Sequence, residues 1–363
     1  MTDQDWRTEI RGRAIFVCGA SGFIGRHLVN ALVEGGAKVT VLTRSRGAMV
    51  SRSGLRIVVG QLDNPPPWAT ALEGTDVLFN LAYDVRAAAS ANLAAFSLLI
   101  RAAEAHGVGR IVHTSSIVVY DDWPARDLDE TGTMARLGGS PYRRAKIEME
   151  RRLMAGPLPA AILQPTIVYG EGSGMWTDGL AAALVGGGVV LPEPEGTCNG
   201  VHVHDVVQAL IRAAVLPDIG QERFVVNGPA PFRWSALLEG YARLMGKGSF
   251  RHLPYSDLLA RLGPKPDENA ELADPPSRAA QISALGRRVL GRARFEGLVR
   301  LAKRRLGRGG PLYPDHHLLE VFSGTGICSI GHARGRLNYR PAYDLGAGLA
   351  ATATHLEKLG QRL

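Results

Sequence analysis

The sequence predicts an α/β fold, a doubly wound parallel sheet with a smaller, mostly helical C-terminal lobe. Short apolar runs, which are typical of buried strands, alternate with helical patterns through the first half of the chain. The first apolar run, residues 14–18, breaks directly into three glycines, and a helical pattern over residues 23–34 follows. A strand, a tight turn and a helix in this order are how such a sheet begins.

The composition is that of an ordinary globular protein. Of the 363 residues, 45% are hydrophobic and 21% are charged, which suits one large α/β domain with a smaller lobe. The N-terminal residues 1–13 carry acids and no apolar core, and the longest apolar run, residues 179–191, is interrupted by glycine and too short to span a bilayer. We therefore expect a cytoplasmic protein. The isolated cysteines give no zinc or redox motif.

The net charge of +8 belongs to one segment. Residues 277–310 contain ten lysines and arginines against one acid, Glu296, a local balance of +9, so the rest of the chain sums to −1. Apolar residues recur there mostly at steps of three and four, which predicts a basic helical segment. Its basic face is either solvated or contacts an anionic ligand, partner or membrane surface. No nucleic-acid-binding motif accompanies it, so no nucleic-acid partner is expected.

The glycines after the first strand predict a pyrophosphate site. Gly19 allows the backbone to turn, Gly22 removes the Cβ atom that would block a phosphate, and Gly25 lets the first helix pack closely on the first strand. The helix N-terminus offers unpaired N–H groups and a positive partial charge to the anion. The spacing G-x-x-G-x-x-G departs from the usual G-x-G-x-x-G fingerprint, and a plain glycine-rich turn is the alternative.

The second strand, residues 38–43, ends in a basic sequence. In this architecture the end of the second strand meets the adenosine ribose, where an acid selects NAD. Here Thr43 is followed by Arg44, Ser45 and Arg46. Because the two arginines can pair with a 2′-phosphate, the sequence favours NADP over NAD. The alternative is a basic surface loop.

The remaining elements follow the same alternation. Strands are expected at residues 55–59, 76–81, 110–114 and 225–227, and helices at residues 86–106, 255–262 and 345–359. Strand ends gather at one edge of a parallel sheet. The residues at the ends of the second, fourth and fifth strands, 43–46, 80–83 and 114–116, should therefore face the same crevice as the glycine turn.

The next helix begins after Ser140 and runs to about Met154. It carries Tyr142 and Lys146, whose spacing of four places both side chains on one face, one turn apart. Because this pair follows the serine-bearing strand end at Ser116, we interpret it as an acid–base pair. A helix-surface pair beside a serine-rich loop is the structural alternative.

Four short sequences together resemble one known family. They are GASGFIG at 19–25, the pair Ser115-Ser116, YRRAK at 142–146 and PTIVYG at 165–170. In this order, over roughly residues 13–228, they resemble the extended short-chain dehydrogenase/reductase family, the NAD(P)-dependent epimerase/dehydratase group. Two residues depart from the family pattern: Tyr83 stands where a small residue is frequent, and Gln164 stands where arginine is frequent.

The resemblance implies a division of the chain and a dimer. A Rossmann-type dinucleotide-binding domain would span residues 1–170, with residues 201–228 returning to it. Residues 171–200 and 229–363 would form the substrate-binding lobe, which includes the basic segment 277–310. A homodimer would join through the helices expected at residues 86–106 and 142–154.

The resemblance also implies site residues. Asp63 would approach the adenine, residues 80–82 would run beside the cofactor, and residues 165–168 would lie near the nicotinamide. Together with the glycine turn and the basic strand end, the cofactor-binding residues expected are Gly19, Ser21, Gly22, Phe23, Ile24, Gly25, Thr43, Arg44, Arg46, Leu62, Asp63, Asn80, Leu81, Ala82, Thr114, Tyr142, Lys146, Pro165, Ile167 and Val168.

Three residues are expected to be catalytic. Tyr142 would be the acid or base, because an adjacent ammonium such as Lys146 favours the phenolate and lowers the pKa of the phenol. The resemblance adds that Lys146 binds the nicotinamide ribose. Ser116 would hydrogen-bond the substrate oxygen. Ser115 is less favoured, because the family's serine lies four residues before a strand-end tyrosine, here Tyr120.

The reaction expected is the interconversion of a carbonyl and a secondary alcohol by hydride transfer. A 4,6-dehydratase is disfavoured, because the family's dehydratases carry Asp-Glu where this chain has Ile117 and Val118. A sugar nucleotide is the favoured substrate, with a lipid or another secondary metabolite also open. The alternatives are an epimerase that retains NAD and a non-catalytic dinucleotide-binding protein.

One further cluster is the sequence around His202, His204 and Asp205. By resemblance it lies on the substrate side of the fold. It offers three metal-ligand side chains, but no second group of ligands elsewhere in the sequence supports a metal site, so none is expected.

Overall fold

The computed structural model describes residues 6–49, 52–136, 138–265 and 310–363. Its centre is a seven-stranded sheet with the strand order β11-β6-β5-β4-β1-β2-β3, and every neighbouring pair is parallel. The strands are β1 (Ala14–Cys18), β2 (Lys38–Thr43), β3 (Leu55–Val59), β4 (Val77–Asn80), β5 (Arg110–Thr114), β6 (Ala160–Pro165) and β11 (Gln221–Val226). The order reverses after β3, which makes the sheet doubly wound as predicted.

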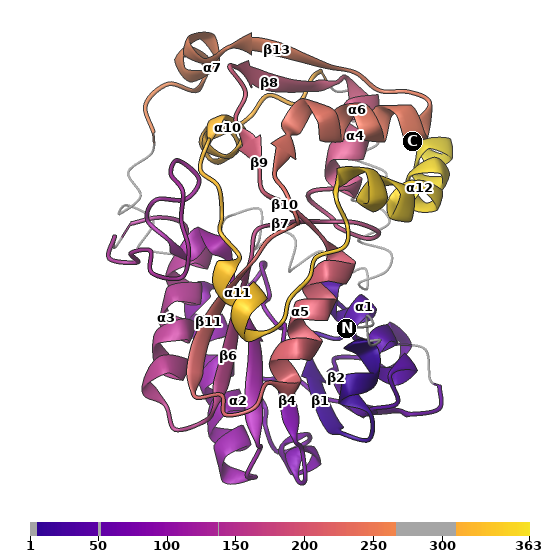
Figure 1. Ribbon diagram of the computed structural model, residues 1–363, viewed down its shortest axis with the longest axis vertical. Helices are drawn as coiled ribbons and strands as arrows, with labels where there is room; N and C mark the ends of the chain where they lie inside the picture. The colour runs from indigo at the N-terminus through magenta and orange to yellow at the C-terminus, as the bar shows by residue number, and fades with distance from the viewer. Residues whose placement is uncertain (1–5, 50–51, 137, 266–309) are drawn as a thin grey trace, which may run out of the picture.

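Helices cover both faces of this sheet (Figure 1). On one face α1 (Phe23–Glu34) packs beside α5 (Val203–Val215), and on the other α2 (Ala89–Ala105) packs beside α3 (Pro141–Ala155). Four 3-10 turns complete this part: η1 (Trp6–Ile10), η2 (Arg46–Ala48), η3 (Ala69–Leu72) and η4 (Ile117–Val119). Two hydrophobic clusters, one under each helical layer, hold the layers to the sheet.

The strand register brings the functional ends together. Cys18 at the end of β1 lies opposite Leu42 of β2 and Asn80 of β4, and Thr114 at the end of β5 lies opposite Leu163 of β6. The ends of these strands therefore share one edge of the sheet, which is where ligands bind in open parallel sheets.

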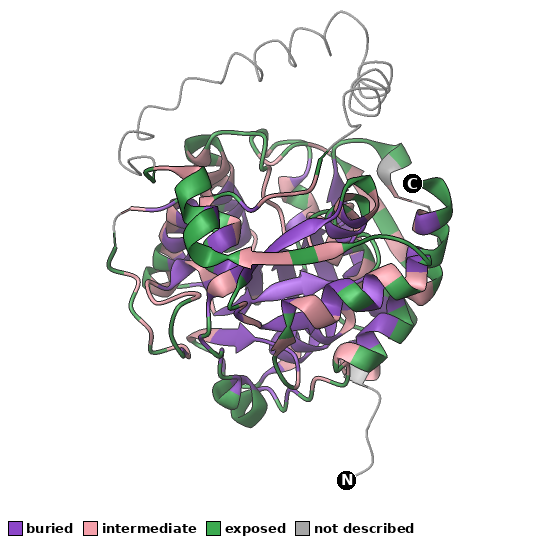
Figure 2. Ribbon diagram, turned by 90° about the horizontal axis from the view of Figure 1, so that it is seen from above, coloured by how far each residue is buried: buried purple, intermediate pink, exposed green. Residues whose placement is uncertain are grey.

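A smaller lobe lies beyond that edge, at the top of Figure 1. It has its own hydrophobic cluster, and Figure 2 shows buried strands inside the molecule with exposed positions on the outer helices. Its helices are α4 (Asp178–Gly186), α6 (Trp234–Met245), α7 (Tyr255–Leu262), α10 (His316–Ser323) and α12 (Leu345–Arg362). Its short strands are β8 (Val189–Glu193) with β13 (Phe250–Pro254), and β9 (Thr197–Cys198) with β12 (Phe232–Arg233).

Two connections tie the lobe to the sheet. The parallel pair β7 (Ile167–Tyr169) and β10 (Gly200–His202) leads into and out of the lobe. The short helix α11 (Gly331–Arg336) returns from the lobe to pack beside β11, as Figure 1 shows. Within the described ranges, no helix combines the length and the apolar character that a membrane span requires. Most of the basic segment 277–310 lies outside the described residues.

Several element bounds differ from those predicted. The helix expected over residues 86–106 begins at Ala89, because Asn92 hydrogen-bonds both the N–H and the C=O of Asp84 and holds the preceding residues in a turn. The last core strand begins at Gln221 rather than Val225. Its first residues are polar because β11 is an edge strand, where Arg223 pairs with the buried Glu150.

Candidate active site

A cavity of about 980 Å³ opens at the carboxyl edge of the sheet, between the sheet and the lobe. It is lined by the turn after β1, the loops after β4, β5 and β7, the start of α3, and α10. The structure brings many of the predicted site residues to its wall: Gly19, Gly22, Phe23, Ile24, Gly25, Leu81, Thr114, Ser116, Tyr142, Lys146, Pro165, Ile167 and Val168.

The glycine turn forms a close-fitting cradle at one end of this cavity. Gly19 has φ +82°, and a Cβ atom there would lie 2.6 Å from the carbonyl carbon of Leu81. A Cβ atom on Gly25 would lie 2.2 Å from the carbonyl oxygen of Gly19. Gly22 is the N-cap of α1 and has no side chain to cap the helix. The first N–H groups of α1 are therefore available to an anion at this end of the cavity.

Thr114 gives a second indication that the cavity suits a polar ligand. Its side chain is buried and lines the cavity, yet Oγ1 has no hydrogen-bond partner among the residues that the structure describes. An unpartnered buried hydroxyl costs free energy unless a ligand or water satisfies it. The glycine cradle and this hydroxyl fit a dinucleotide whose pyrophosphate lies on the N-terminus of α1.

The predicted acid–base pair is positioned by the start of α3. Ser140 caps the helix by accepting a hydrogen bond from the N–H of Arg143 (3.2 Å), and Pro141 occupies the first helical position. Tyr142 and Lys146 then point to the cavity from consecutive turns. Lys146 Nζ donates a hydrogen bond to the carbonyl oxygen of Thr114 (2.7 Å). Burial lowers the pKa of Lys146 from 10.5 to about 8, and the charge of Glu150 opposes this shift.

The pKa of Tyr142 differs from the expectation. Burial, with a smaller contribution from Tyr83, raises it from 10.0 to about 12, although a hydrogen bond with Ser116 lowers it. The predicted lowering by Lys146 is not seen. Lys146 Nζ lies 5.7 Å from the centroid of the Tyr142 ring and donates to a carbonyl instead. Desolvation of the phenolate therefore outweighs the ammonium.

The two serines after β5 have different surroundings. Ser116 lies beside Tyr142 on the cavity wall, and its Oγ accepts a hydrogen bond from the N–H of Val118 (3.4 Å). Ser115 is directed to Glu150 by a short hydrogen bond, inside a buried network in which Gln164 Nε2 also donates to that carboxylate (3.0 Å). Ser116, rather than Ser115, is thus the serine whose hydroxyl adjoins the phenol of Tyr142.

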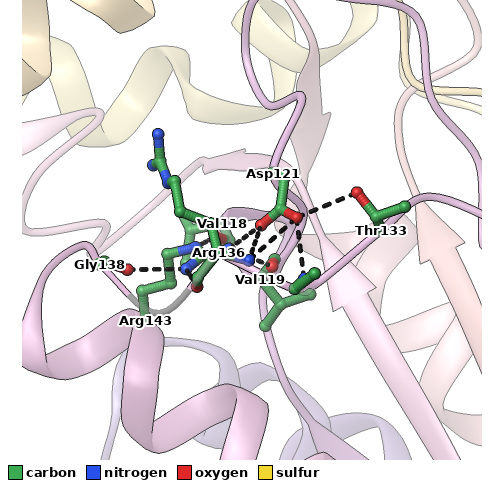
Figure 3. A network of polar contacts seen from close by, with 8 residues as sticks. Val118, Val119, Asp121, Thr133, Arg136, Gly138 and Arg143 are labelled. Atoms are coloured by element: carbon green, nitrogen blue, oxygen red, sulfur yellow. Dashed lines mark hydrogen bonds and ion pairs between the residues drawn. The ribbon is translucent and has the colours of Figure 1, made fainter.

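Arg143 fixes the wall of the cavity next to this pair. Figure 3 shows its guanidinium among backbone carbonyls of the loop that follows β5. It donates to the carbonyl oxygens of Val118, Val119, Arg136 and Gly138 at 2.8–3.0 Å, and it forms a close ion pair with Asp121. Since the same guanidinium is attached one residue after Tyr142, it sets the position of this loop relative to α3.

The predicted adenosine end is more exposed. Thr43 is buried, and its Oγ1 donates to the carbonyl oxygen of Ser45 (3.1 Å), which shapes the turn after β2. Arg44 Nη1 pairs with Asp84 Oδ2 at 2.9 Å, a contact that the sequence does not indicate. Arg46 begins η2 and Asp63 is exposed. None of these four lines the cavity described above.

Four more predicted residues lie away from the cavity wall. Asn80 is buried, with Nδ2 3.1 Å from Nδ1 of His113 and Oδ1 accepting the N–H of Ala82 (3.2 Å). Leu62 and Ala82 pack against the cluster under α2 and α3, and Ser21 accepts a hydrogen bond from Arg26 at its carbonyl oxygen. These residues support the edge of the sheet.

The side chains of His202 and Asp205 contact the segment around Tyr343. His202 stacks on Tyr343 with ring centroids 4.5 Å apart, and Asp205 accepts the N–H groups of Ala342 (2.8 Å) and Tyr343 (3.1 Å). Burial lowers the pKa of His202 to about 3, so its ring is neutral at physiological pH. Among the described residues, no set of three or more His, Cys, Asp or Glu side chains is placed to hold a metal ion.

Sequence reasoning missed two features of the cavity. Tyr83 is expected from the sequence to face the crevice, but its contact with Tyr142 is not: the two rings meet edge to face with centroids 4.9 Å apart. The outer wall is formed by large apolar side chains from separate loops, including Trp123, Met175 and Trp176. This wall could not be predicted, because nothing in the sequence shows which loops the fold brings together.

Comparison with known proteins gives results that agree with this geometry. A family model described as NAD(P)H-binding matches residues 19–185. A ketoreductase from Stigmatella aurantiaca, named for 4-hydroxy-2-methyl-3-oxo-4-farnesyl-3,4-dihydroquinoline-1-oxide, is 27% identical over 76% of this chain and 86% of its own. A 3-diazoavenalumate denitrifying reductase from a Streptomyces species is 30% identical over 66% of this chain and 84% of its own.

A solved structure shares the whole architecture. MoeE5 in complex with UDP-glucuronic acid and NAD superposes with a TM-score of 0.65, covering 96% of this chain and 99% of that one at 21% identity. At this identity the likeness shows the fold alone.

Proposed function

The chain belongs to the extended short-chain dehydrogenase/reductase family, and we propose that it is an NADPH-preferring reductase of a carbonyl group on an apolar substrate. That it is an oxidoreductase or epimerase of this family, with a nicotinamide cofactor, follows from its relatives. The finer proposal is carried by one observation: Tyr142, Ser116 and Lys146 adjoin one another on a cavity that also contains the glycine cradle.

The residues have a consistent role in carbonyl reduction. The bound reduced nicotinamide would supply the hydride. Tyr142 would donate the proton to the carbonyl oxygen, and its pKa of about 12 keeps the phenol protonated at neutral pH, as an acid must be. The Ser116 hydroxyl, beside that phenol, would hydrogen-bond the same oxygen as its negative charge develops. The buried Lys146 ammonium would stabilise the phenolate that remains after proton transfer.

The cofactor would be held by the residues at the sheet edge. The N-terminus of α1, made accessible by Gly22, would bind the pyrophosphate. Oγ1 of Thr114, which has no hydrogen-bond partner among the described residues, would form a hydrogen bond with the nicotinamide half of the cofactor. Arg44 and Arg46, both exposed at the end of β2, would bind a 2′-phosphate, which supports NADPH over NADH.

An apolar substrate is supported by the outer part of the cavity. Its wall there contains Val118, Trp123, Met175 and Trp176, which offer aromatic and aliphatic surface. Two of the cations at this wall have partners: Arg143 binds backbone carbonyls and Asp121, and Lys265 pairs with Glu320 at 2.9 Å, while Arg136 also lines the cavity. The relative from S. aurantiaca is named for a farnesyl-bearing ketone. A diphosphate, as in the sugar nucleotide favoured from the sequence, would compete for these paired cations.

A substrate panel tests the proposal. Purified protein is mixed with NADPH or NADH and with an aromatic ketone, a long-chain 2-alkyl-3-oxoester or UDP-glucose, and absorbance at the nicotinamide band is followed. We expect oxidation of NADPH with an apolar ketone and none with UDP-glucose. Retention of stoichiometric NAD through purification, with equilibration of UDP-sugars and no consumption of NADPH, would establish the epimerase alternative instead. Full biological effect of a Tyr142→Phe protein would favour the non-catalytic alternative.

Two expectations about partners stay proposals of the same kind. A homodimer would join through α2 and α3, which pack side by side on one face of the sheet, and light scattering of the eluted protein measures its mass. The basic segment 277–310, with its local charge of +9, would bind an anionic surface. Sedimentation with phosphatidylserine vesicles at physiological salt, compared with phosphatidylcholine vesicles, tests this. A cytoplasmic location also stays a prediction.

A further inference from the structure

Tyr83 is held rigidly at the edge of the cavity. It follows β4 in a loop whose backbone is anchored on both sides of it. Before it, the N–H of Ala82 donates to Asn80 Oδ1 (3.2 Å). After it, the N–H of Asp84 donates to Asn92 Oδ1 (2.8 Å), and Asn92 Nδ2 donates back to the carbonyl oxygen of Asp84 (3.0 Å). The backbone on both sides of Tyr83 is therefore held in place, and it presents the ring at the cavity wall.

The Tyr83 ring contacts both members of the acid–base pair. Its plane lies at 89° to the ring of Tyr142, with centroids 4.9 Å apart, which is the favourable edge-to-face arrangement. The ammonium of Lys146 lies 5.3 Å from the centroid of the Tyr83 ring and 5.7 Å from that of Tyr142. Both distances are within the range of a cation–π interaction, which is strongest when the cation is removed from water, as Lys146 is.

We propose that Tyr83 is a positioning residue for this pair: its ring fixes the orientation of Tyr142 and holds the Lys146 ammonium in its charged form. The catalytic importance of Tyr83 rests on the proposed function, whereas its effect on the orientation of Tyr142 and the charge of Lys146 does not. With a small residue at position 83, the Lys146 ammonium would keep its hydrogen bond to the Thr114 carbonyl oxygen. It would lose the aromatic ring that the loop after β4 places against it. Tyr83 thus replaces part of the solvation that burial removes from Lys146.

Several other groups face Lys146 and act on the same equilibrium. Tyr142 and Glu150 lie one turn to either side of it on α3, and His113 lies on β5. The charge of Glu150 favours the ammonium, whereas His113 is neutral, since burial and then the charge of Lys146 hold the pKa of His113 well below 6.5. Substitutions at Tyr83 leave all three groups in place. A change in the titration of Lys146 in such variants therefore measures the contribution of the ring.

The test is the pH dependence of stability. Since the folded-state pKa of Lys146 is about 8 and the unfolded value is 10.5, the unfolded chain binds a proton that the folded chain lacks between these values. The free energy of unfolding should therefore gain a rising contribution between about pH 8 and 10.5. Urea unfolding is measured from pH 6 to 11 for the wild type and for Tyr83→Leu, each beside its Lys146→Met partner. The difference within each pair isolates the titration of Lys146.

We expect the onset of this rise to move down by about one pH unit in Tyr83→Leu, because a cation–π contact of ordinary strength is lost. Tyr83→Phe keeps the ring and should restore the wild-type onset. Tyr255→Leu, the same substitution at an exposed position of α7, is the matched control and should leave the onset unchanged. Tyr83→Met serves as the test variant if Tyr83→Leu does not fold. An onset in Tyr83→Leu or Tyr83→Met equal to that of the wild type would overturn the proposal.

A kinetic measurement separates this proposal from the proposed function. With a ketone that the wild type reduces, Tyr83→Leu should lower kcat about tenfold or more while KM for NADPH changes less than threefold, and Tyr83→Phe should recover most of kcat. If the wild type reduces no carbonyl compound, the proposed function fails, and the stability titration still decides the role of Tyr83. Equal loss of kcat in Tyr83→Phe and Tyr83→Leu would contradict a role for the ring.

Discussion

The two ends of the proposed dinucleotide site differ in how firmly they are built. At the catalytic end, Lys146 is only 3% exposed and contacts Thr114 and Tyr83 at once. At the adenosine end, the side chain of Arg44 is 60% exposed, and it pairs with Asp84, whose side chain is itself 39% exposed. Under the proposed function, buried contacts would fix the catalytic geometry, whereas the exposed ion pair would set the preference for one cofactor. Substitutions at the first end should therefore have large effects and those at the second small ones.

The largest effect is expected at the phenol. Tyr142→Phe removes the proposed acid and keeps the ring that packs against Tyr83. We expect kcat for ketone reduction to fall about 10³-fold, within the range for loss of a general acid, while the dissociation constant for NADPH, measured by fluorescence, changes less than threefold. A Tyr142→Phe enzyme with a tenth or more of wild-type kcat would remove Tyr142 from the mechanism.

The next effect concerns the support beneath the catalytic end. Glu150 is fully buried and binds Arg223 (2.7 Å), Gln164 and Ser115. Glu150→Gln leaves the guanidinium of Arg223 without its counter-ion, so the free energy of unfolding should fall by about 3 kcal/mol. Glu148→Gln, on the same helix, breaks only the exposed pair with Arg152 and should cost less than about 1 kcal/mol. Urea denaturation of both variants at pH 7 measures the contrast, and equal losses would contradict it.

The smallest effect is expected at the adenosine end. Asp84 and a 2′-phosphate would compete for Arg44. Burial raises the pKa of the Asp84 carboxyl, but the backbone N–H of Arg86 and the Arg44 side chain together hold it below its usual value. Arg44→Ala should weaken binding of 2′,5′-ADP about tenfold and leave 5′-AMP unaffected, whereas Asp84→Asn should strengthen 2′,5′-ADP several-fold. Calorimetry with both nucleotides measures these changes. A ratio of the two affinities that stays constant in both variants would assign the discrimination to other residues.

The predictable parts of this molecule are those that short sequences encode. The strands β1, β2, β3 and β5 were predicted at their observed bounds, because a buried parallel strand needs a run of apolar residues that ends in a turn. The glycine turn could also be predicted from the sequence, because the crowding at Gly19 and Gly25 leaves no space for a side chain.

The unpredicted parts depend on contacts between distant residues. The sequence around Arg44 predicts an anion-binding side chain, which stays a prediction, but it gives no sign of the ion pair with Asp84, forty residues later. The pKa of Tyr142 was predicted to fall because Lys146 is four residues away, and it rises because the fold removes the phenol from water. In the sequence, Glu150 looks like an ordinary helix residue. Only the fold shows that Gln164 on β6 and Arg223 on β11 lie against it. Local pattern predicts elements, but burial decides how each ionisable group behaves.

We propose that this protein transfers hydride from NADPH to a carbonyl with Tyr142 as the proton donor. The most direct test of this proposal uses NADPH that carries deuterium at C4 on the transferred face, with product analysed by mass spectrometry. We predict that the wild type forms an alcohol with one deuterium on the former carbonyl carbon, and that Tyr142→Phe forms about 10³-fold less of it in the same time. Product without deuterium, or labelled alcohol formed equally fast by Tyr142→Phe, would contradict the account.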